Sequence, residues 1–278
     1  MLDIVYIDGD FVKRDEARLP LNDLGLLRAY GVFDYFRFVA GKLQFFPDHW
    51  LRFQRSAAQL DLALDLTVDE ASNLIHELIG RNGQTDGGIR LLLTGGSAND
   101  GYTPVQPRFM AMEFAHRQPP SQLYKEGASV LIHRYERQAP SIKSIDYIEG
   151  IRLLKRLKAN RFDFPIYMDR DNHLRESDRS NFMIVKHGKL IAPVDEILLG
   201  ITRKHVLRLA HQLDIPIEER HVSLKEFLQA DEALLTSSTK GVMPITRSDH
   251  GLVNGGAVGS VTRQLMQYWP GYTAISRA

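Results

Sequence analysis

The chain of 278 residues contains no cysteine. Disulfide bonds, thiolate nucleophiles and cysteine-ligated metals are therefore excluded, and the composition suits a reducing cytoplasm, where we expect the protein. An excess of charge of one sign is also lacking, because 35 Lys and Arg against 34 Asp and Glu leave a formal net charge of +1. So nearly neutral a chain offers no general attraction for nucleic acid or for an anionic membrane.

Long apolar runs are missing as well, and none approaches the ~18 residues that a membrane-spanning helix needs. The stretch MLDIVYIDGDFV has no basic segment followed by an apolar one, so we expect no signal peptide. The 10 histidines are scattered without HxxxH or HExxH spacing, and we expect no catalytic metal. No G-x-G-x-x-G follows a strand and no P-loop is present, which leaves little support for a Rossmann fold or a nucleotide triphosphate site.

What remains is an ordinary soluble composition, with 44% hydrophobic and 25% charged residues. Turn signals at Asp8-Gly9 and Ala40-Gly41 predict two hairpins near the N-terminus. Further elements expected in this half are helices over 49–64 and 67–82 and strands over 89–94 and 108–114. Capping-box patterns at Thr67 with Glu70 and at Ser223 with Glu226 each indicate the start of a helix.

The second half mixes strands and helices less regularly, and the polar stretch HRQPPSQ (116–122) is the best linker candidate. Strands are expected over 127–134, 173–193 (as a hairpin) and 232–237, and helices over 147–161, 200–214 and 261–269. This order favours an α+β fold over a doubly wound parallel sheet. We predict a smaller N-terminal α/β domain over 1–117, a linker over 118–122 and a larger, β-rich C-terminal domain with helices over 123–278.

Lys143 is the first residue with possible chemistry, in the stretch PSIKSIDY. A lysine in an arbitrary loop is exposed, but Ile142 and Ile145 could draw this amine inward. Desolvation can lower a lysine pKa toward ~7–8, which makes the amine a nucleophile or a base. The residues alone leave both interpretations open.

Two hydroxyl-bearing junctions could bind an anion. Gly200-Ile201-Thr202 enters a predicted helix, where unpaired N–H groups and the helix dipole favour a phosphate. The turn 236–239, TSST, follows a predicted buried strand. Each junction could equally be a simple cap. From composition and spacing alone, the chain is a soluble α+β enzyme or binding domain.

Five stretches in fixed order carry the argument further: GVFDYFR with HWLRF and RSA, IKSIDY, RESDRSN, LLGITR, and ADEALLTSSTKGVMPI. Together they resemble the fold-type IV pyridoxal-phosphate enzymes, which include branched-chain aminotransferases, D-amino acid transaminases and aminodeoxychorismate lyases. The resemblance covers nearly the whole chain. It implies the two-domain fold of D-amino acid aminotransferases, a pyridoxal 5'-phosphate cofactor and a homodimer.

The resemblance also assigns roles around the cofactor. Lys143 would form the Schiff base and carry the proton between substrate Cα and cofactor C4′. Glu176 would face the pyridine nitrogen and keep it protonated, so that the ring can accept electrons. Tyr147 would hydrogen-bond the phenolic oxygen. The phosphate would be held by Arg52, Ile201, Thr202 and Ser238.

The substrate side departs from the family pattern. D-amino acid transaminases often hold the α-carboxylate with an R-x-H pair after T-R-G, but Gly95, Asp100 and Tyr102 stand at those places. Arg28 and Arg179 occupy positions where relatives have other residues, and we predict that their guanidinium groups replace the missing trap. An ion pair of Arg179 with Asp178 is the alternative.

Three more residues are placed with the substrate: Tyr35, Arg37 and Ser237. Tyr35 and Arg37 could shape the side-chain pocket or simply face outward. We interpret Asp231, Glu232, Trp50 and Trp269 as structural.

The preferred function is therefore a D-amino acid transaminase that uses a 2-oxo acid such as 2-oxoglutarate, with ping-pong kinetics. A branched-chain L-amino acid aminotransferase, supported by the stretch DGYTP, is the first alternative. An aminodeoxychorismate lyase is the second, and a catalytically silent ligand-binding member is the third.

Overall fold

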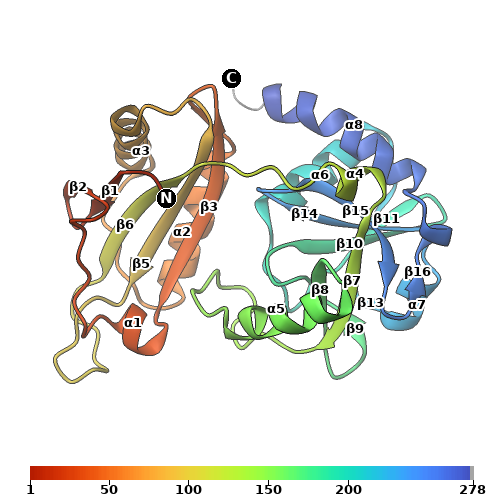
Figure 1. Ribbon diagram of the computed structural model, residues 1–278, viewed down its shortest axis with the longest axis horizontal. Helices are drawn as coiled ribbons and strands as arrows, with labels where there is room; N and C mark the ends of the chain where they lie inside the picture. The colour runs from red at the N-terminus through yellow and green to blue at the C-terminus, as the bar shows by residue number, and fades with distance from the viewer. Residues whose placement is uncertain (276–278) are drawn as a thin grey trace. The chain divides into compact units, whose positions relative to one another are not determined.

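The computed structural model describes residues 1–275 and divides into two compact units (Figure 1). The first unit contains Met1–Arg117 together with Ile142–Asp146, and the second contains Gln118–Ser141 and the chain from Tyr147 onward. Residues 142–146 thus group with the first unit, whereas the sequence-based division put them in the second. The reason is a set of backbone hydrogen bonds to the first unit's sheet, described below; the linker over 118–122 stays a prediction.

The first unit is built on a six-stranded sheet in the order β2-β1-β6-β5-β3-β4, in which every pairing is antiparallel. Both predicted hairpins are present, because β1 pairs with β2 and β3 pairs with β4. The strands are β1 (Ile4–Ile7), β2 (Asp10–Lys13), β3 (Gly31–Val39), β4 (Lys42–Leu43), β5 (Gly87–Thr94) and β6 (Arg108–Phe114).

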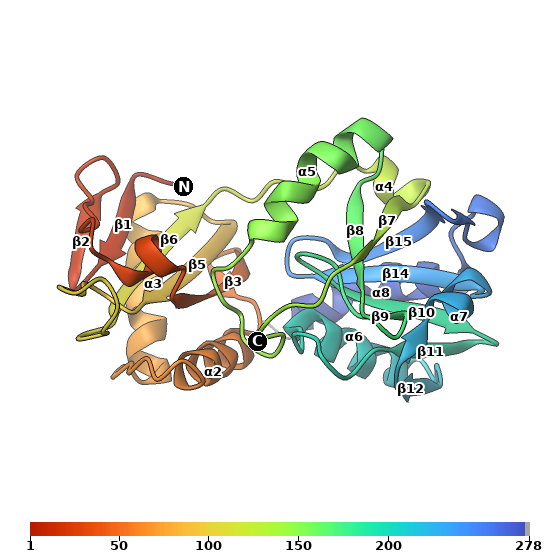
Figure 2. The ribbon, with the colours of Figure 1, turned by 90° about the horizontal axis from the view of Figure 1, so that it is seen from below.

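Three helices accompany this sheet: α1 (Leu24–Arg28), α2 (Phe46–Ala58) and α3 (Val68–Asn82). The predicted capping box is confirmed at α3, where the Thr67 hydroxyl accepts from Glu70 N and the Glu70 carboxylate accepts from Thr67 N. Figure 2 shows α2 lying along one face of the sheet, against β3. The two faces of this sheet therefore differ in what covers them.

From Val32 onward, strand β3 alternates between buried and partly buried positions. Val32, Asp34 and Phe36 are fully buried on one face of the strand. Phe33 and Tyr35, which are only partly buried, belong to the other face, because successive side chains of a strand point to opposite sides. This alternation decides which side chains of the first unit are available to a ligand.

The second unit contains a ten-stranded sheet in the order β12-β11-β10-β14-β15-β7-β8-β9-β13, with β16 paired to β15. Three pairings are parallel, namely β11 with β12, β15 with β7 and β7 with β8, and the rest are antiparallel. The strands are β7 (Ala128–Arg134), β8 (Phe164–Met168), β9 (His173–Leu174), β10 (Asn181–Lys186), β11 (Lys189–Ala192), β12 (Ile217–Glu219), β13 (Val222–Ser223), β14 (Glu232–Ser237), β15 (Gly241–Ser248) and β16 (Gly251–Leu252).

The helices of the second unit are α4 (Gln122–Lys125), α5 (Ile148–Asn160), α6 (Ile201–Gln212), α7 (Leu224–Leu228) and α8 (Ser260–Ile275), with a 3-10 turn η1 (Asn254–Gly256). Helices α6 and α8 pack against β14 and β15 (Figure 1). Within residues 1–275, no helix combines the length and the apolar character that a membrane-crossing segment requires.

Alternate residues of the central strands feed two separate cores. Phe182 and Leu235 belong to one buried cluster, while Met183 and Leu234 belong to another that includes residues of α6 and α8. Glu232 supports this arrangement because its carboxylate accepts from Val261 N at 2.9 Å and from Thr262 N at 2.7 Å, in the first turn of α8. The mixture of two largely antiparallel sheets with separate helices is the α+β architecture that the sequence predicts.

Candidate active site

Lys143, which belongs to the first unit, is held by backbone hydrogen bonds to β3. Phe33 N donates to Lys143 O at 2.9 Å, and Ile145 N donates to Gly31 O at 3.1 Å. These bonds form an antiparallel bridge between Val32 and Ser144. Lys143 N also donates to Ser56 Oγ at 3.2 Å, on α2. A short segment from far along the chain is thereby added to β3, and it positions the lysine.

The amine of Lys143 lies over an aromatic ring. Its Nζ is 4.7 Å from the centroid of Phe33, a distance at which the ring face attracts an ammonium. Because Phe33, Tyr35 and Arg37 alternate on one face of β3, three residues proposed from the sequence (Lys143, Tyr35 and Arg37) belong to the same side of this strand. Burial raises the pKa of the Tyr35 phenol, although the charge of Arg37 partly offsets the effect.

On the buried side of β3, a carboxylate organises a guanidinium and an imidazole. Asp34 is fully buried and accepts from Arg52 Nε at 2.9 Å, from Arg52 Nη2 at 2.8 Å and from His49, whose Nδ1 is 2.8 Å away. Burial alone would raise the pKa of Asp34, but Arg52 and His49 outweigh it and hold that pKa well below its usual value. Burial lowers the pKa of His49.

This network orients Arg52, the residue proposed for the cofactor phosphate. Both bonds to Asp34 use the Nε side of the guanidinium, and Nη1 makes no hydrogen bond to any residue in 1–275. The sequence analysis missed Asp34 and His49. The signal was present, since a carboxylate stands at a core position of an otherwise apolar strand face, and such a group is expected to be paired.

Arg28, the other substrate residue proposed in the first unit, ends the short helix α1 and is exposed. Its Nη1 donates only to the carbonyl of the preceding residue, Leu27, at 3.2 Å. The side chain thus carries an arginine's full charge at the surface, with no carboxylate partner within the described part of the chain.

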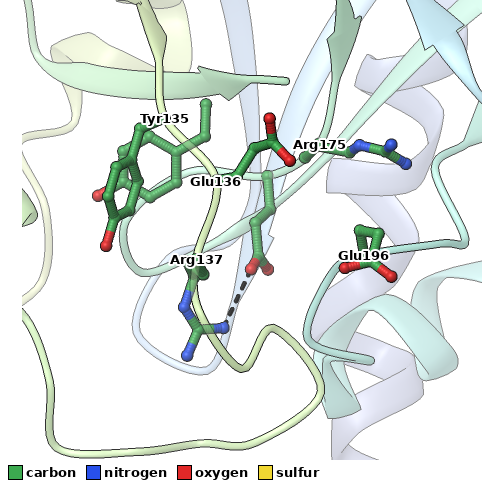
Figure 3. A pocket seen from close by; sticks show the side chains of 7 residues that line it. Tyr135, Glu136, Arg137, Arg175 and Glu196 are labelled. Carbon is green, nitrogen blue, oxygen red and sulfur yellow. Dashed lines mark hydrogen bonds and ion pairs between the residues drawn. The ribbon is translucent and has the colours of Figure 1, made fainter. Parts of the chain in front are cut away.

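In the second unit, a buried carboxylate is the centre of a polar cluster. Glu176 is 5% exposed, and its Oε1 accepts from Arg137 Nη1 at 3.2 Å. Its Oε2 accepts from Leu198 N at 3.1 Å and from Asn181 Nδ2 at 3.4 Å. In Figure 3, a dashed line joins the guanidinium of Arg137 to a carboxylate among the side chains that line a pocket. Charged and amide donors of this kind keep a carboxylate ionised.

A pocket lies beside Glu176, and the space of about 310 Å³ in and in front of it includes open solvent (Figure 3). Its lining combines two phenols, two guanidinium groups and three carboxylates: Tyr135, Tyr167, Arg137, Arg175, Glu136, Glu176 and Glu196. Arg137 also donates to Pro140 O at 2.9 Å, which ties the loop before the lysine segment to Glu176. Sequence reasoning missed Arg137, because nothing in its neighbourhood of the chain points to Glu176.

Tyr147 stands at the start of α5, close to the same charges. Burial raises the pKa of Tyr147 to about 12, and the charges of Arg137, Glu176, Asp178 and Arg179 also act on it. The phenol therefore stays protonated at neutral pH and can donate a hydrogen bond. Tyr147, Glu176 and Arg179, which the sequence analysis proposed independently, are thus brought together in one unit.

Arg179 makes the ion pair that the sequence analysis kept as an alternative to substrate binding. Its Nε donates to Asp178 Oδ2 at 2.9 Å. The arginine side chain is nevertheless 59% exposed, while that of Asp178 is 6% exposed. Neither Nη of Arg179 bonds to a residue in 1–275. The ion pair therefore orients the guanidinium and leaves its outer edge for another anion.

The residues proposed for the phosphate lie at two junctions of the second unit. Gly200 precedes α6 without a side-chain cap, and Ile201 and Thr202 open that helix. A Cβ at Gly200 would overlap Asn181 Oδ1, so glycine is required there. In the turn after β14, the Ser237 hydroxyl lies 3.3 Å from both Thr239 Oγ1 and Lys240 N, whereas the Ser238 hydroxyl makes no bond within the described residues.

The donors of the second unit fit pyridoxal phosphate. An uncapped helix start and the Thr202 and Ser238 hydroxyls suit a phosphate, a buried carboxylate suits a protonated ring nitrogen, and a neutral phenol suits a phenolic oxygen. In the first unit, the guanidinium of Arg52 is likewise a group that suits a phosphate. Residues 1–275 contain no group of three or more His, Asp or Glu side chains arranged to hold a metal ion.

Residues 31–248 match the family model for amino-transferase class IV. The chain belongs to this family. It is 30% identical over 274 residues to a D-alanine aminotransferase of Staphylococcus epidermidis, with 96% of this chain and 97% of that protein covered. The family identification made from the sequence motifs is therefore confirmed.

Two solved structures place the fold. A branched-chain amino acid aminotransferase of Escherichia coli superposes with a TM-score of 0.92 at 22% identity, covering 98% of this chain and 94% of that one. A second branched-chain amino acid aminotransferase, from T.th. and solved with pyridoxamine 5'-phosphate, gives a TM-score of 0.90 at 21% identity, covering 99% and 95%. At these identities the likeness shows the fold, which is the two-domain α+β fold of type IV. The enzyme is a pyridoxal phosphate-dependent aminotransferase.

Proposed function

We propose that this aminotransferase acts on D-amino acids and passes the amino group to a 2-oxo acid such as 2-oxoglutarate. The observation that carries the proposal is the oriented, outward-facing guanidinium of Arg179 in a chain that lacks the usual R-x-H trap. The similarity to a D-alanine aminotransferase over 96% of the chain supports it. We further propose that the enzyme is a cytoplasmic homodimer.

Lys143 is the proposed base at the substrate Cα. When bound, the cofactor supplies a conjugated ring that accepts the electron pair left at Cα after proton removal. The backbone bonds of Lys143 to β3 hold the origin of its side chain, and the Phe33 ring provides a surface along which the amine can lie. These contacts would let Nζ take the proton from Cα and deliver it to C4′ of the cofactor without losing its position.

Glu176 and Tyr147 are proposed to set the protonation of the ring. Glu176, which accepts from Arg137 and the Leu198 amide, would hold a proton on the ring nitrogen, because a carboxylate charge favours the cationic form. Burial raises the pKa of Tyr147 to about 12, so its hydroxyl would keep its proton and donate a hydrogen bond to the phenolic oxygen.

The phosphate is proposed to be held by Arg52, Ile201, Thr202 and Ser238. Asp34 fixes Arg52 through its Nε edge, so that the guanidinium loses little rotational freedom on binding an anion. The first-turn amides of α6 have no side-chain cap and are suited to phosphate oxygens.

Arg28 and Arg179 are proposed to bind the substrate α-carboxylate, in place of the missing trap. Guanidinium forks match the two oxygens of a carboxylate. Arg28 would serve the site of its own chain or, in a homodimer, that of the second chain. Tyr35 and Arg37 are proposed to line the pocket for the substrate side chain, with Ser237 in a supporting place.

A panel of D- and L-amino acids with 2-oxoglutarate tests the proposal. We expect conversion of D-amino acids, measured as D-specific loss of donor and formation of glutamate. Conversion of branched-chain L-amino acids alone would contradict the proposed stereochemistry, and release of pyruvate from aminodeoxychorismate would indicate a lyase. The purified protein should be yellow, with a colour that borohydride discharges; failure to take up the cofactor would indicate a silent member.

A further inference from the structure

Lys240 is placed by a tight hairpin turn between β14 and β15. Ser237 pairs with Gly241 across the turn, and Lys240 N donates to Ser237 O at 3.2 Å. Gly241 has φ +63°, the left-handed conformation that favours glycine, and a Cβ there would lie 2.9 Å from Trp269 Nε1. The backbone oxygen of Lys240 accepts from the Tyr124 hydroxyl at 2.8 Å. Hydrogen bonds therefore fix both the backbone N–H and the backbone oxygen of Lys240, and with them the Cα from which its side chain starts.

The ammonium of Lys240 has an unusual environment for a partly buried lysine. Nζ donates to Ser180 Oγ at 2.9 Å and lies 4.7 Å from the centroid of the Phe164 ring. Lys240 forms no ion pair with any residue in 1–275. An ammonium has three donors, so one hydroxyl and one ring face account for only part of its bonding capacity.

The charged neighbours of this amine lie in the loop before β10. Arg179 and Asp178 both act on Lys240, and Tyr124 is the titratable group on the α4 side. Burial and, to a lesser extent, the charge of Arg179 lower the pKa of Lys240 to about 8, although the charge of Asp178 partly opposes them. Lys240 therefore lies near a second cation, Arg179. The nearby carboxylate of Asp178 forms its hydrogen bond with Arg179 and not with Lys240.

Ser180 connects the amine to the residues of the loop. Ser177 N donates to Ser180 O at 2.8 Å, which closes a turn over 177–180 with Arg179 inside it. The bond from Lys240 Nζ to Ser180 Oγ thus anchors the segment that carries Arg179. An apolar side chain would fill the same space without the cost of desolvating an ammonium, and the Phe164 ring offsets only part of that cost. The arrangement makes sense if an anion completes it.

We propose that Lys240 is a positioning residue for substrate carboxylate binding: its ammonium anchors the Arg179 loop through Ser180 and adds a positive charge that an incoming carboxylate experiences. The proposal rests on the proposed function, because it takes Arg179 as the carboxylate ligand. It assigns Lys240 no contact with the reacting atoms. Binding should then weaken when Lys240 loses its proton.

The test uses the holoenzyme and glutarate, a dicarboxylate without a keto group, whose affinity follows from the absorbance change of the bound cofactor. Lys240→Met keeps the length of the side chain and removes the charge, Lys240→Arg keeps the charge, and Lys225→Met is the control at an exposed lysine on α7. Each variant is titrated from about pH 6.5 to about pH 9.5, a range in which carboxylates do not titrate. KM for 2-oxoglutarate, kcat and Tm are measured alongside.

For the unmodified enzyme, the Kd for glutarate should rise above pH 8. Lys240→Met should raise that Kd and the KM for 2-oxoglutarate about fivefold to tenfold at neutral pH, with kcat within about twofold. Its Kd should no longer depend on pH in this range. Lys240→Arg should bind glutarate like the unmodified enzyme at neutral pH. Its Kd should not rise at higher pH, because a guanidinium stays charged.

An unchanged Kd in Lys240→Met, or a lower Tm with the same pH profile, would overturn the proposal. If Lys240→Met does not fold, Lys240→Arg decides, since a rise in Kd that persists in that variant excludes titration of Lys240. Glutarate has no chiral centre, so a finding that the substrates are L-amino acids would contradict the proposed function and leave this test intact.

Discussion

Two groups of polar residues, one in each unit, each pair one arginine with one aspartate, but in opposite ways. Arg52 gives two hydrogen bonds to Asp34, which is fully buried and also bonded to His49. Arg179 gives one bond to Asp178, remains 59% exposed, and has the second cation Lys240 nearby. The first arrangement neutralises its cation and fixes it in the fold. The second holds its cations in place while leaving positive charge for a ligand.

The comparison shows that an arginine paired with aspartate can either stabilise the fold or be oriented for binding a ligand. A buried pair loses much when one partner is removed, because the remaining charge is left uncompensated. An exposed pair contributes little to stability, yet it can orient a guanidinium for binding. Stability measurements should therefore respond to the first group, and substrate affinity to the second.

The largest expected effect is a loss of stability when the Asp34 carboxylate of the first group is removed. Asp34→Asn should lower the free energy of unfolding of the apoenzyme by about 3–5 kcal/mol, because Arg52 and His49 lose their shared anion. Urea unfolding at neutral pH measures the change, with Asp10→Asn at an exposed position as the control. A loss as small as the control's would mean that the network does not stabilise the fold.

The same variant gives a pH test. Since the folded-state pKa of Asp34 lies below its usual value, its contribution is present above the unfolded pKa and is lost as pH falls through the folded one. The difference in stability between the unmodified enzyme and Asp34→Asn should thus shrink on strong acidification. A constant difference would contradict the assigned direction.

The second group should respond in binding, and so should Arg28 of the first unit, which has no carboxylate partner within the described residues. Arg179→Ala and Arg28→Ala should each raise KM for amino and 2-oxo acids about tenfold to a hundredfold, because a charged hydrogen bond to the carboxylate is lost. Cofactor affinity and Tm should change little, in contrast to Asp34→Asn. Arg152→Ala, on the exposed face of α5, is the matched control. An unchanged KM in both variants would refute the carboxylate clamp.

A carboxylate without a cation sharpens the comparison further. Glu113 on β6 is fully buried; burial raises its pKa, and the nearby Asn82 amide offsets only part of the effect. Its ionised form destabilises the fold above the unfolded pKa. Glu113→Gln should therefore stabilise the apoenzyme by about 1–3 kcal/mol at neutral pH, and by less as the pH approaches the unfolded value. Destabilisation at neutral pH would show that Glu113 has a partner that the amide cannot replace.

Local signals in the sequence were enough for most of the fold. The Asp8-Gly9 turn, the Ala40-Gly41 turn and the Thr67 cap each depend on neighbours in the chain, and each appears in the structure as predicted. Local patterns did not predict that the segment 142–146 pairs with β3 of the first unit. Its short bridge to β3 has no periodic pattern, and its partner lies far earlier in the chain.

The candidate site shows the same limit. Lys143, Tyr147, Glu176 and Arg179 could be named from motifs, and their roles toward cofactor and substrate stay predictions. The side chains that support them could not. Asp34, Arg137 and Lys240 act through partners distant in sequence, and single-sequence patterns carry no record of such pairs.

Asn181 has a wider consequence than its single side chain suggests. Its Nδ2 lies 2.7 Å from Leu198 O and 3.4 Å from Glu176 Oε2, and its Oδ1 fills the space that a side chain at Gly200 would need. One amide thus contacts both the acid proposed for the ring nitrogen and the glycine that precedes the helix proposed for the phosphate. We therefore expect the two proposed halves of cofactor recognition to tighten or loosen together.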